Sequence, residues 1–168
     1  MSNFMSGVFP ILSTPFDSND NIIFNDVQSE VEYAIDSGVS GIAIALASEI
    51  YKLTDSERDD LLKKIVNYSN NRIKVCMNTS AESTKICIEY SKKAQDFGAD
   101  AVMIAPPAFG GIDSSEIKKY FINVAESIEI PIFMQDVFET PISPELAFEL
   151  SQANENLAYL KVEVPPTL

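Results

Sequence analysis

The sequence contains no histidine and no tryptophan, and it has only two cysteines among its 168 residues. The missing histidine excludes, within this chain, a histidine general base, a Ser-His-Asp triad and a histidine-ligated metal. Cys76 and Cys87 lie in apolar runs, so we expect no disulfide scaffold. A reducing compartment fits this cysteine usage, and the sequence therefore predicts a cytoplasmic protein.

Basic residues are also scarce, because 12 Lys and Arg stand against 25 Asp and Glu, a formal net charge of −13. This imbalance argues against a nucleic acid or an anionic membrane surface as partner. No apolar run approaches the ~20 residues of a membrane span, and the N-terminus lacks the pattern of a signal peptide. A small anionic substrate stays open, because a site can be locally positive inside an acidic protein.

Short apolar runs alternate with longer amphipathic stretches at a spacing of about 30 residues, the size of a βαβ unit. The apolar runs predict six strands, over 7–16, 41–48, 74–79, 100–107, 131–136 and 158–164. The amphipathic stretches predict five helices, over 24–38, 54–71, 83–98, 114–129 and 143–154. No linker or low-complexity segment interrupts them, so residues 1–168 are predicted to form a single domain.

This alternation predicts a parallel sheet with helices outside, and two architectures compete. A doubly wound open sheet needs only five or six strands, whereas an eight-stranded barrel needs about 250 residues. Length alone favours the open sheet, but no predicted strand is followed by a dinucleotide or P-loop motif. The sequence also ends directly after the strand predicted over 158–164, as expected of part of a longer protein.

A lysine stands in the middle of the apolar run AYLKVEV. Because strand side chains alternate between faces, Lys161 and Glu163 share one face, and the neighbouring apolar residues share the other. Burying an amine is costly unless it is paired or its pKa falls, and a lowered pKa lets the amine attack a carbonyl and form a Schiff base. The alternative is a lysine at a strand end that pairs with Glu163 or with solvent.

Five segments carry a resemblance to a known family. They are STPF at 13–16, GVSGIAIALASEIYKLTDSER at 38–58, GADAVMIAPPAFGG at 98–111, IPIFMQD at 130–136 and YLKVE at 159–163. Together they resemble the N-terminal part of the dihydrodipicolinate synthase / N-acetylneuraminate lyase family of Schiff-base-forming class I aldolases. The resemblance implies a (β/α)8 TIM barrel, incomplete here because its C-terminal units are missing. It also implies that Lys161 condenses with the keto group of pyruvate or a related 2-oxo acid, without a metal or other cofactor, in a homo-oligomer (dimer or tetramer).

The second predicted strand departs from the family pattern. Where the family has a Gly-Thr-Thr-Gly-Glu-like motif that holds the substrate carboxylate, this chain has Ala45-Leu46-Ala47-Ser48-Glu49. The backbone N–H groups of Leu46 and Ala47 remain able to bind an anion. Ser48 is the one nearby hydroxyl, so these three residues are predicted to bind the substrate carboxylate.

The fifth strand departs further. The family's Tyr-Asn-x-Pro is replaced by Gln135 and Asp136, and glutamine can hydrogen-bond but cannot act as an acid or base. Thr140 stands where the synthases have an arginine, and Ala108 and Phe109 replace a pair of tyrosines. We therefore do not expect the synthase activity of lysine biosynthesis.

The remaining polar residues define the predicted site. Strands five and six are neighbours in a barrel, so Gln135 should point toward Lys161 and orient the adduct. Glu163 is the candidate for proton transfer if burial raises its pKa; otherwise it forms a plain ion pair with Lys161. Asp136 is a candidate contact to the substrate, or alternatively a loop cap.

The sequence thus predicts a Schiff-base-forming lyase, an aldolase or a dehydratase, that acts on pyruvate or a related 2-oxo acid. One alternative is a catalytically impaired family member that binds a metabolite or a sister subunit. Another is a truncated fragment with no activity of its own.

Overall fold

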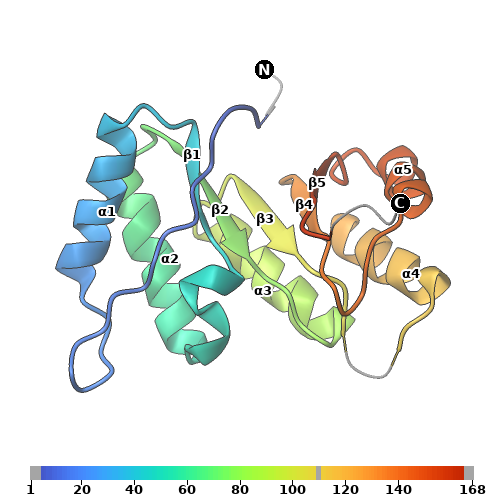
Figure 1. The fold of residues 1–168 in the computed structure, drawn as a ribbon, viewed down its shortest axis with the longest axis horizontal. Coiled ribbons are helices and arrows are strands. Elements are labelled where there is room, and N and C mark those ends of the chain that lie inside the picture. Colours follow the sequence, from blue (N-terminus) through green and yellow to red (C-terminus); the bar gives the residue numbers. More distant parts are fainter. Residues whose placement is uncertain (1–4, 109–110, 165–168) are drawn as a thin grey trace. The chain divides into compact units, whose positions relative to one another are not determined.

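The computed structural model describes residues 5–108 and 111–164. The chain forms two compact units, Met1–Asn78 with Asp96–Asp100 and Thr79–Gln95 with Ala101–Leu168. In both units strands alternate with helices along the chain (Figure 1), as the apolar pattern predicts. The elements are α1 (Phe24–Asp36), β1 (Gly41–Ile44), α2 (Asp55–Ser69), β2 (Lys74–Asn78), α3 (Thr84–Asp96), β3 (Ala101–Ile104), α4 (Ser114–Ala125), β4 (Ile132–Gln135), α5 (Pro144–Ala153) and β5 (Tyr159–Lys161).

In the first unit β1 and β2 pair in parallel, from Gly41 opposite Lys74 to Ile44 opposite Met77. Every residue of β1 is buried, which explains its unbroken apolar sequence. A side chain at position 41 would place its Cβ 2.1 Å from the Phe9 ring and 2.7 Å from the Lys74 carbonyl oxygen. Glycine is therefore required where this strand approaches its neighbours.

The first predicted strand is not formed as a regular strand, so the described residues contain five strands rather than six. An extended segment instead runs beside β1, with one parallel bridge between Ile11 and Ala43. The Leu12 N–H donates to the Ala43 carbonyl and the Ala43 N–H donates to the Pro10 carbonyl, both at 2.9 Å. Proline has no N–H to donate, which limits a ladder through Pro10.

The second predicted strand is shorter than its apolar run. β1 ends at Ile44, and two short 3-10 turns follow, Leu46–Ser48 and Ile50–Lys52. Glu49 between them has a left-handed backbone, with φ of 59°. An apolar run indicates that residues are buried, and the buried residues here continue from the strand into these turns. The run therefore does not show where the strand ends.

The helix ends follow local capping chemistry. The Thr54 hydroxyl accepts the Glu57 N–H, and the Glu57 carboxylate accepts the Thr54 N–H at 2.8 Å, so the two residues form a capping box at the start of α2. Ser143 caps α5 by accepting the Leu146 N–H at 3.2 Å. Gly38, just after α1, has the positive φ of 72° that suits a helix stop.

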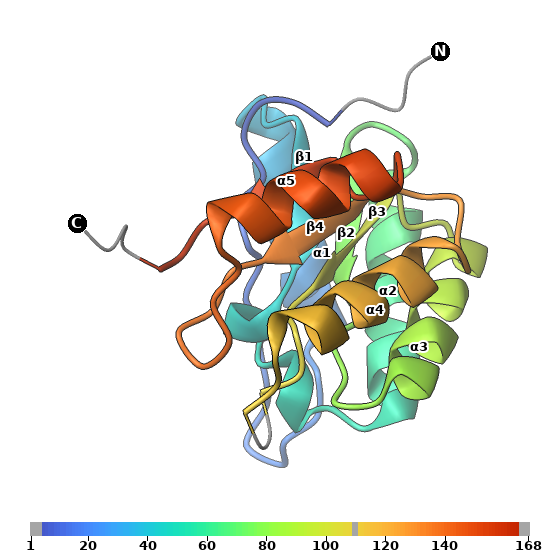
Figure 2. The same cartoon turned by 90° about the vertical axis from the view of Figure 1, so that its right-hand side faces the viewer.

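In the second unit β3, β4 and β5 pair in parallel in that order. Helices α4 and α5 lie against each other (Figure 2). The unit's core is formed by fully buried side chains, the largest being Ile104, Phe121, Ile132, Met134, Leu150 and Leu157. Over residues 5–108 and 111–164, no helix has both the length and the apolarity needed to cross a bilayer.

Candidate active site

Lys161 is the last residue of β5, and it lies in register with Gln135, the last residue of β4. The pairing of β4 with β5 confirms that the fifth and sixth predicted strands are neighbours. The Lys161 side chain is 27% exposed, and its ammonium group is ion-paired with Glu163 Oε1. Gln135 is buried, and its Nε2 donates to Glu163 Oε2 at 2.6 Å. The lysine and the glutamine therefore meet on the same carboxylate.

Glu163 lies two residues beyond Lys161, and 40% of its side chain is exposed. Burial by itself would raise the pKa of this carboxyl group. The hydrogen bonds from Lys161 and Gln135 and the positive charge of Lys161 outweigh burial, so the pKa is lowered from its ordinary value. The prediction of proton transfer depends on a raised pKa of Glu163, and the structure does not show one. It does show the alternative, an ion pair between Glu163 and Lys161.

Asp136 directly follows β4 and is 5% exposed. Its Oδ1 accepts the Ile142 N–H at 2.9 Å, and its Oδ2 accepts the Val164 N–H at 3.3 Å. The first of these bonds closes the loop before α5, as expected of a loop cap. The role of Asp136 as a substrate contact stays a prediction.

The predicted carboxylate-binding segment Leu46–Ser48 belongs to the first unit, whereas Lys161 belongs to the second. The Ser48 hydroxyl is buried, donates to the Leu12 carbonyl at 2.5 Å and accepts the Ala45 N–H at 3.1 Å. Its one O–H donor, the group that a substrate carboxylate would need, is thus used within the fold. The N–H groups of Leu46 and Ala47 make no hydrogen bond within residues 5–108 and 111–164, which leaves both as possible donors to an anion.

Thr140 and Ala108, two further residues at which the sequence departs from the family pattern, both lie in the second unit. Thr140 is buried, and its hydroxyl donates to the Pro107 carbonyl at 3.2 Å. The Ala108 N–H donates to the Glu82 carboxylate at 3.0 Å, a contact that no sequence motif indicated. Phe109 lies outside the described residues.

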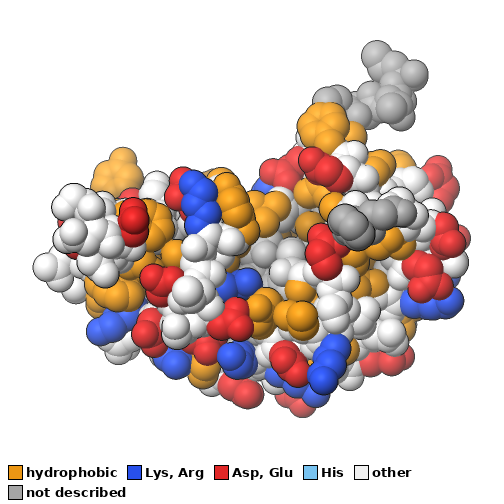
Figure 3. Space-filling model, turned by 90° about the horizontal axis from the view of Figure 1, so that it is seen from below, with side chains coloured by type: hydrophobic (Ala, Val, Ile, Leu, Met, Phe, Trp, Pro, Cys, Tyr) orange, Lys and Arg blue, Asp and Glu red, His pale blue; other side chains and the backbone are white. Residues whose placement is uncertain are grey.

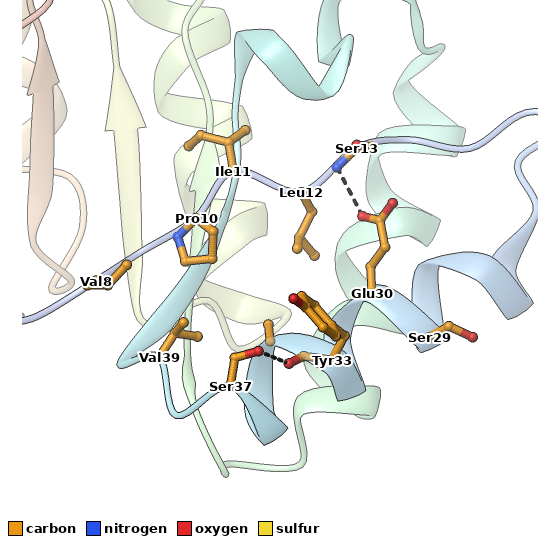
Figure 4. Close-up of a pocket in the computed structure, with 11 residues that line it drawn as sticks. Val8, Pro10, Ile11, Leu12, Ser13, Ser29, Glu30, Tyr33, Ser37 and Val39 are labelled. Carbon is orange, nitrogen blue, oxygen red and sulfur yellow. Dashed lines mark hydrogen bonds between the residues drawn. The ribbon is translucent and has the colours of Figure 1, made fainter.

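An open groove of about 600 Å³ lies in the first unit, between the extended segment after residue 7 and helix α1 (Figure 4). Apolar side chains dominate its lining, which also includes Tyr33 and Glu30. The Glu30 carboxylate accepts the Ser13 N–H at 3.0 Å, and burial raises its pKa more than this bond lowers it. None of the predicted site residues lines this groove.

No group of three or more Cys, Asp or Glu side chains in the described part of the chain is arranged to hold a metal ion. The polar cluster at the ends of β4 and β5 instead consists of an amine, a carboxylate and an amide. Such a cluster can bind a carbonyl compound, form an imine with it, and move a proton over a short distance.

Comparison with known proteins places the chain in a family. Residues 4–164 match the dihydrodipicolinate synthetase family. An L-2-keto-3-deoxyarabonate dehydratase of Azospirillum brasilense is 33% identical over 165 residues, which cover 95% of this chain and 53% of that protein. A 4-hydroxy-tetrahydrodipicolinate synthase of Methanococcus maripaludis is 30% identical over 168 residues, covering 98% of this chain and 57% of that protein.

Among solved structures, a dihydrodipicolinate synthase superposes with a TM-score of 0.93 at 30% identity, covering 96% of this chain and 57% of the other. The chain therefore spans about half the length of the relatives that it matches. The parallel βα units and this likeness together confirm the expectation of an incomplete (β/α)8 barrel. This chain is thus a member of the dihydrodipicolinate synthetase family.

Proposed function

We propose that the chain carries the nucleophile of a Schiff-base-forming lyase that acts on pyruvate or a related 2-oxo acid. The observation that carries this proposal is the placement of Lys161, a part-buried lysine at the carboxyl end of a barrel strand and in contact with a carboxylate. Barrel enzymes build their active sites at the carboxyl ends of the strands. The dehydratase relative, which is named for a 2-keto acid, supports the substrate class.

The proposed step begins with transfer of a proton from the Lys161 ammonium group to the Glu163 carboxylate. The free amine then attacks the keto carbon of the substrate, and the electron pair of the C=O bond moves to oxygen. The carbinolamine oxygen receives two protons, one from Glu163 and one that the attacking nitrogen loses after addition, and leaves as water while the nitrogen lone pair forms the C=N bond of a protonated imine. Glu163 is ionised at neutral pH, as an ordinary carboxyl group is, and so is in the form that accepts the first proton. Its lowered pKa makes it a weak base, which returns this proton readily to the carbinolamine oxygen.

Gln135 fills a positioning role in this proposal. Its buried amide donates to Glu163 at 2.6 Å and has no titratable proton of its own. It therefore orients the carboxylate and the adduct without exchanging protons with either. For the substrate carboxylate, the N–H groups of Leu46 and Ala47 beside Ser48 stay the predicted donors.

The proposed substrate has a single carboxylate and a neutral polar remainder, such as a sugar-derived 2-oxo acid. Thr140 stands at the place of the synthases' arginine, and its hydroxyl already donates to the Pro107 carbonyl. A threonine supplies no positive charge, so the second carboxylate of a dicarboxylic adduct would have no cationic side chain to bind it at this position.

The test is reductive trapping on the intact chain. Pyruvate or a 2-keto-3-deoxy sugar acid is added with sodium borohydride, and the modified peptide is identified by mass spectrometry. We expect an adduct on Lys161 that is absent from Lys161→Ala. Lys74→Ala is the matched control, because Lys74 is also a strand lysine paired with a carboxylate, Asp100 at 2.6 Å, and its removal should leave trapping intact. Finding no adduct on Lys161 with either acid would overturn the proposal.

A second candidate function is binding without chemistry. It is favoured by the ion pair that engages the Lys161 amine and by the commitment of the Ser48 hydroxyl to the backbone. In that case calorimetry should detect binding of a 2-oxo acid that is equally tight in Lys161→Ala. A Schiff-base enzyme would instead lose affinity in this variant.

A further inference from the structure

We infer that Asp136 is a positioning residue that fastens the chain beyond β5 to the end of β4 and so holds Glu163 beside Lys161. This inference rests on the proposed function of Lys161. It assigns to Asp136 a part in building the site that differs from contact with the substrate.

Asp136 forms hydrogen bonds with the backbone on both sides of Glu163. The Asp136 N–H donates to the Lys161 carbonyl at 3.0 Å, and Asp136 Oδ2 accepts the Val164 N–H at 3.3 Å. Glu163 lies between these two attachment points. The same residue therefore anchors the backbone on both sides of the carboxylate that pairs with Lys161.

Packing alone gives this segment little support. β5 is only three residues long, Val162 is 66% exposed, and the Glu163 side chain is 40% exposed. Few apolar contacts therefore fix the chain beyond Lys161, and its hydrogen bonds matter more than they would in a core strand. The bond from the Val164 N–H is charge-assisted, since a carboxylate accepts it, whereas the bond from the Asp136 N–H to the Lys161 carbonyl joins two neutral backbone groups.

The carboxylate itself is held in place by a second segment. Asp136 Oδ1 accepts the Ile142 N–H at 2.9 Å, directly before the Ser143 cap of α5. Asp136 is 5% exposed, and each of its two oxygens accepts a hydrogen bond from a backbone N–H group. Asparagine has one oxygen, and its NH₂ group would face an N–H donor, so Asp136→Asn removes one of these bonds.

The direct test follows the Glu163 carboxyl group by ¹³C NMR titration of the intact chain. In Asp136→Asn we expect the pKa of Glu163 to rise by about half a pH unit, because the carboxylate moves away from Lys161 and Gln135. Asp113→Asn is the matched control, because Asp113 also accepts two backbone N–H groups in the same unit, those of Ser115 and Glu116. Its loss should leave the titration of Glu163 unchanged, whereas an unchanged titration in Asp136→Asn would overturn the inference.

Reductive trapping gives a second readout. Asp136→Asn should slow trapping of pyruvate on Lys161 by about 10- to 100-fold, as expected when a reacting group is misplaced, and Asp113→Asn should not. If the unmodified chain traps no 2-oxo acid, the proposed function fails, while the titration still decides the role of Asp136. Asp136→Ser, which retains one small acceptor, replaces Asp136→Asn should that variant not fold.

Discussion

At the residue scale, the chemistry of the proposed site depends on one carboxylate shared by two donors. Glu163 accepts a hydrogen bond from Gln135 at 2.6 Å and is ion-paired with Lys161. The amide of Gln135 stands where the resemblance places a tyrosine, and an amide cannot exchange protons, so proton exchange with Lys161 is assigned to Glu163 in the proposed step.

Replacing this carboxylate tests its role. Glu163→Gln keeps the shape of the side chain but cannot accept the Lys161 proton, so we expect trapping of pyruvate on Lys161 to slow by about 100-fold. Glu149→Gln is the control, because Glu149 also pairs with a lysine of the same unit, Lys118 at 2.8 Å. Faster or equal trapping in Glu163→Gln would show that the ion pair merely occupies the amine.

The two thiols give a second prediction at this scale. Cys76 and Cys87 are both buried, and neither forms a disulfide within residues 5–108 and 111–164. Burial, with a smaller contribution from the charge of Asp100, raises the pKa of the Cys76 thiol, so the reactive thiolate is scarce. We expect iodoacetamide to modify neither cysteine in the native chain at pH 7, as followed by mass spectrometry. Both should react in denaturant, and rapid native labelling of Cys76 would contradict its burial.

At the scale of elements, the helix starts agree with local sequence because capping involves residues only three apart. Thr54 with Glu57 and Ser143 with Leu146 form bonds that need no distant partner. The strand limits agree less well. The apolar run after Gly41 continues past Ile44, but the chain turns there.

The capping box of α2 is testable through stability. Thr54→Ala removes the hydroxyl that accepts the Glu57 N–H, and we expect the free energy of unfolding to fall by about 1 kcal/mol. Denaturant unfolding followed by circular dichroism measures the change. Ser29→Ala is the control, because the Ser29 hydroxyl bonds within its own helix to the Asn25 carbonyl at 3.0 Å. Equal losses in the two variants would contradict a specific capping contribution.

At the scale of the whole molecule, acidic charge dominates. The formal net charge is −13, and acidic side chains are distributed over the face seen in Figure 3. Several carboxyl groups have a lowered pKa because hydrogen bonds hold them in the charged form. Glu32 is held by Arg72, Glu57 by Thr54, and Asp113 by Ser115 and Glu116.

These carboxylates predict how stability depends on pH. A group whose pKa is lower in the folded than in the unfolded state stabilises the fold above its unfolded value of about 4 and loses this contribution as pH falls. Glu30 acts in the opposite direction, because burial raises its pKa. More of these carboxyl groups have a lowered pKa than a raised one. We therefore expect the free energy of unfolding to be smaller at pH 3 than at pH 5. Equal or greater stability at pH 3, in the same denaturant titration, would contradict this.

The sequence by itself determined the features that depend on near neighbours. Apolar periodicity indicated the alternation of strands and helices, capping residues marked helix starts, and the polar interruption of a strand singled out Lys161. The predicted strand over 7–16 failed because pairing along a whole strand depends on its partner, and the backbone at Pro10 offers that partner only a carbonyl.

Only the tertiary structure decided which polar groups meet. Gln135 and Glu163 are 28 residues apart and come together because β4 and β5 pair in one register. The lowered pKa of Glu163 follows from that meeting, and no local pattern encodes it. The same holds for Asp136, whose carboxylate reaches Val164 across 28 residues, because contacts between strands are set by the fold and not by spacing along the chain.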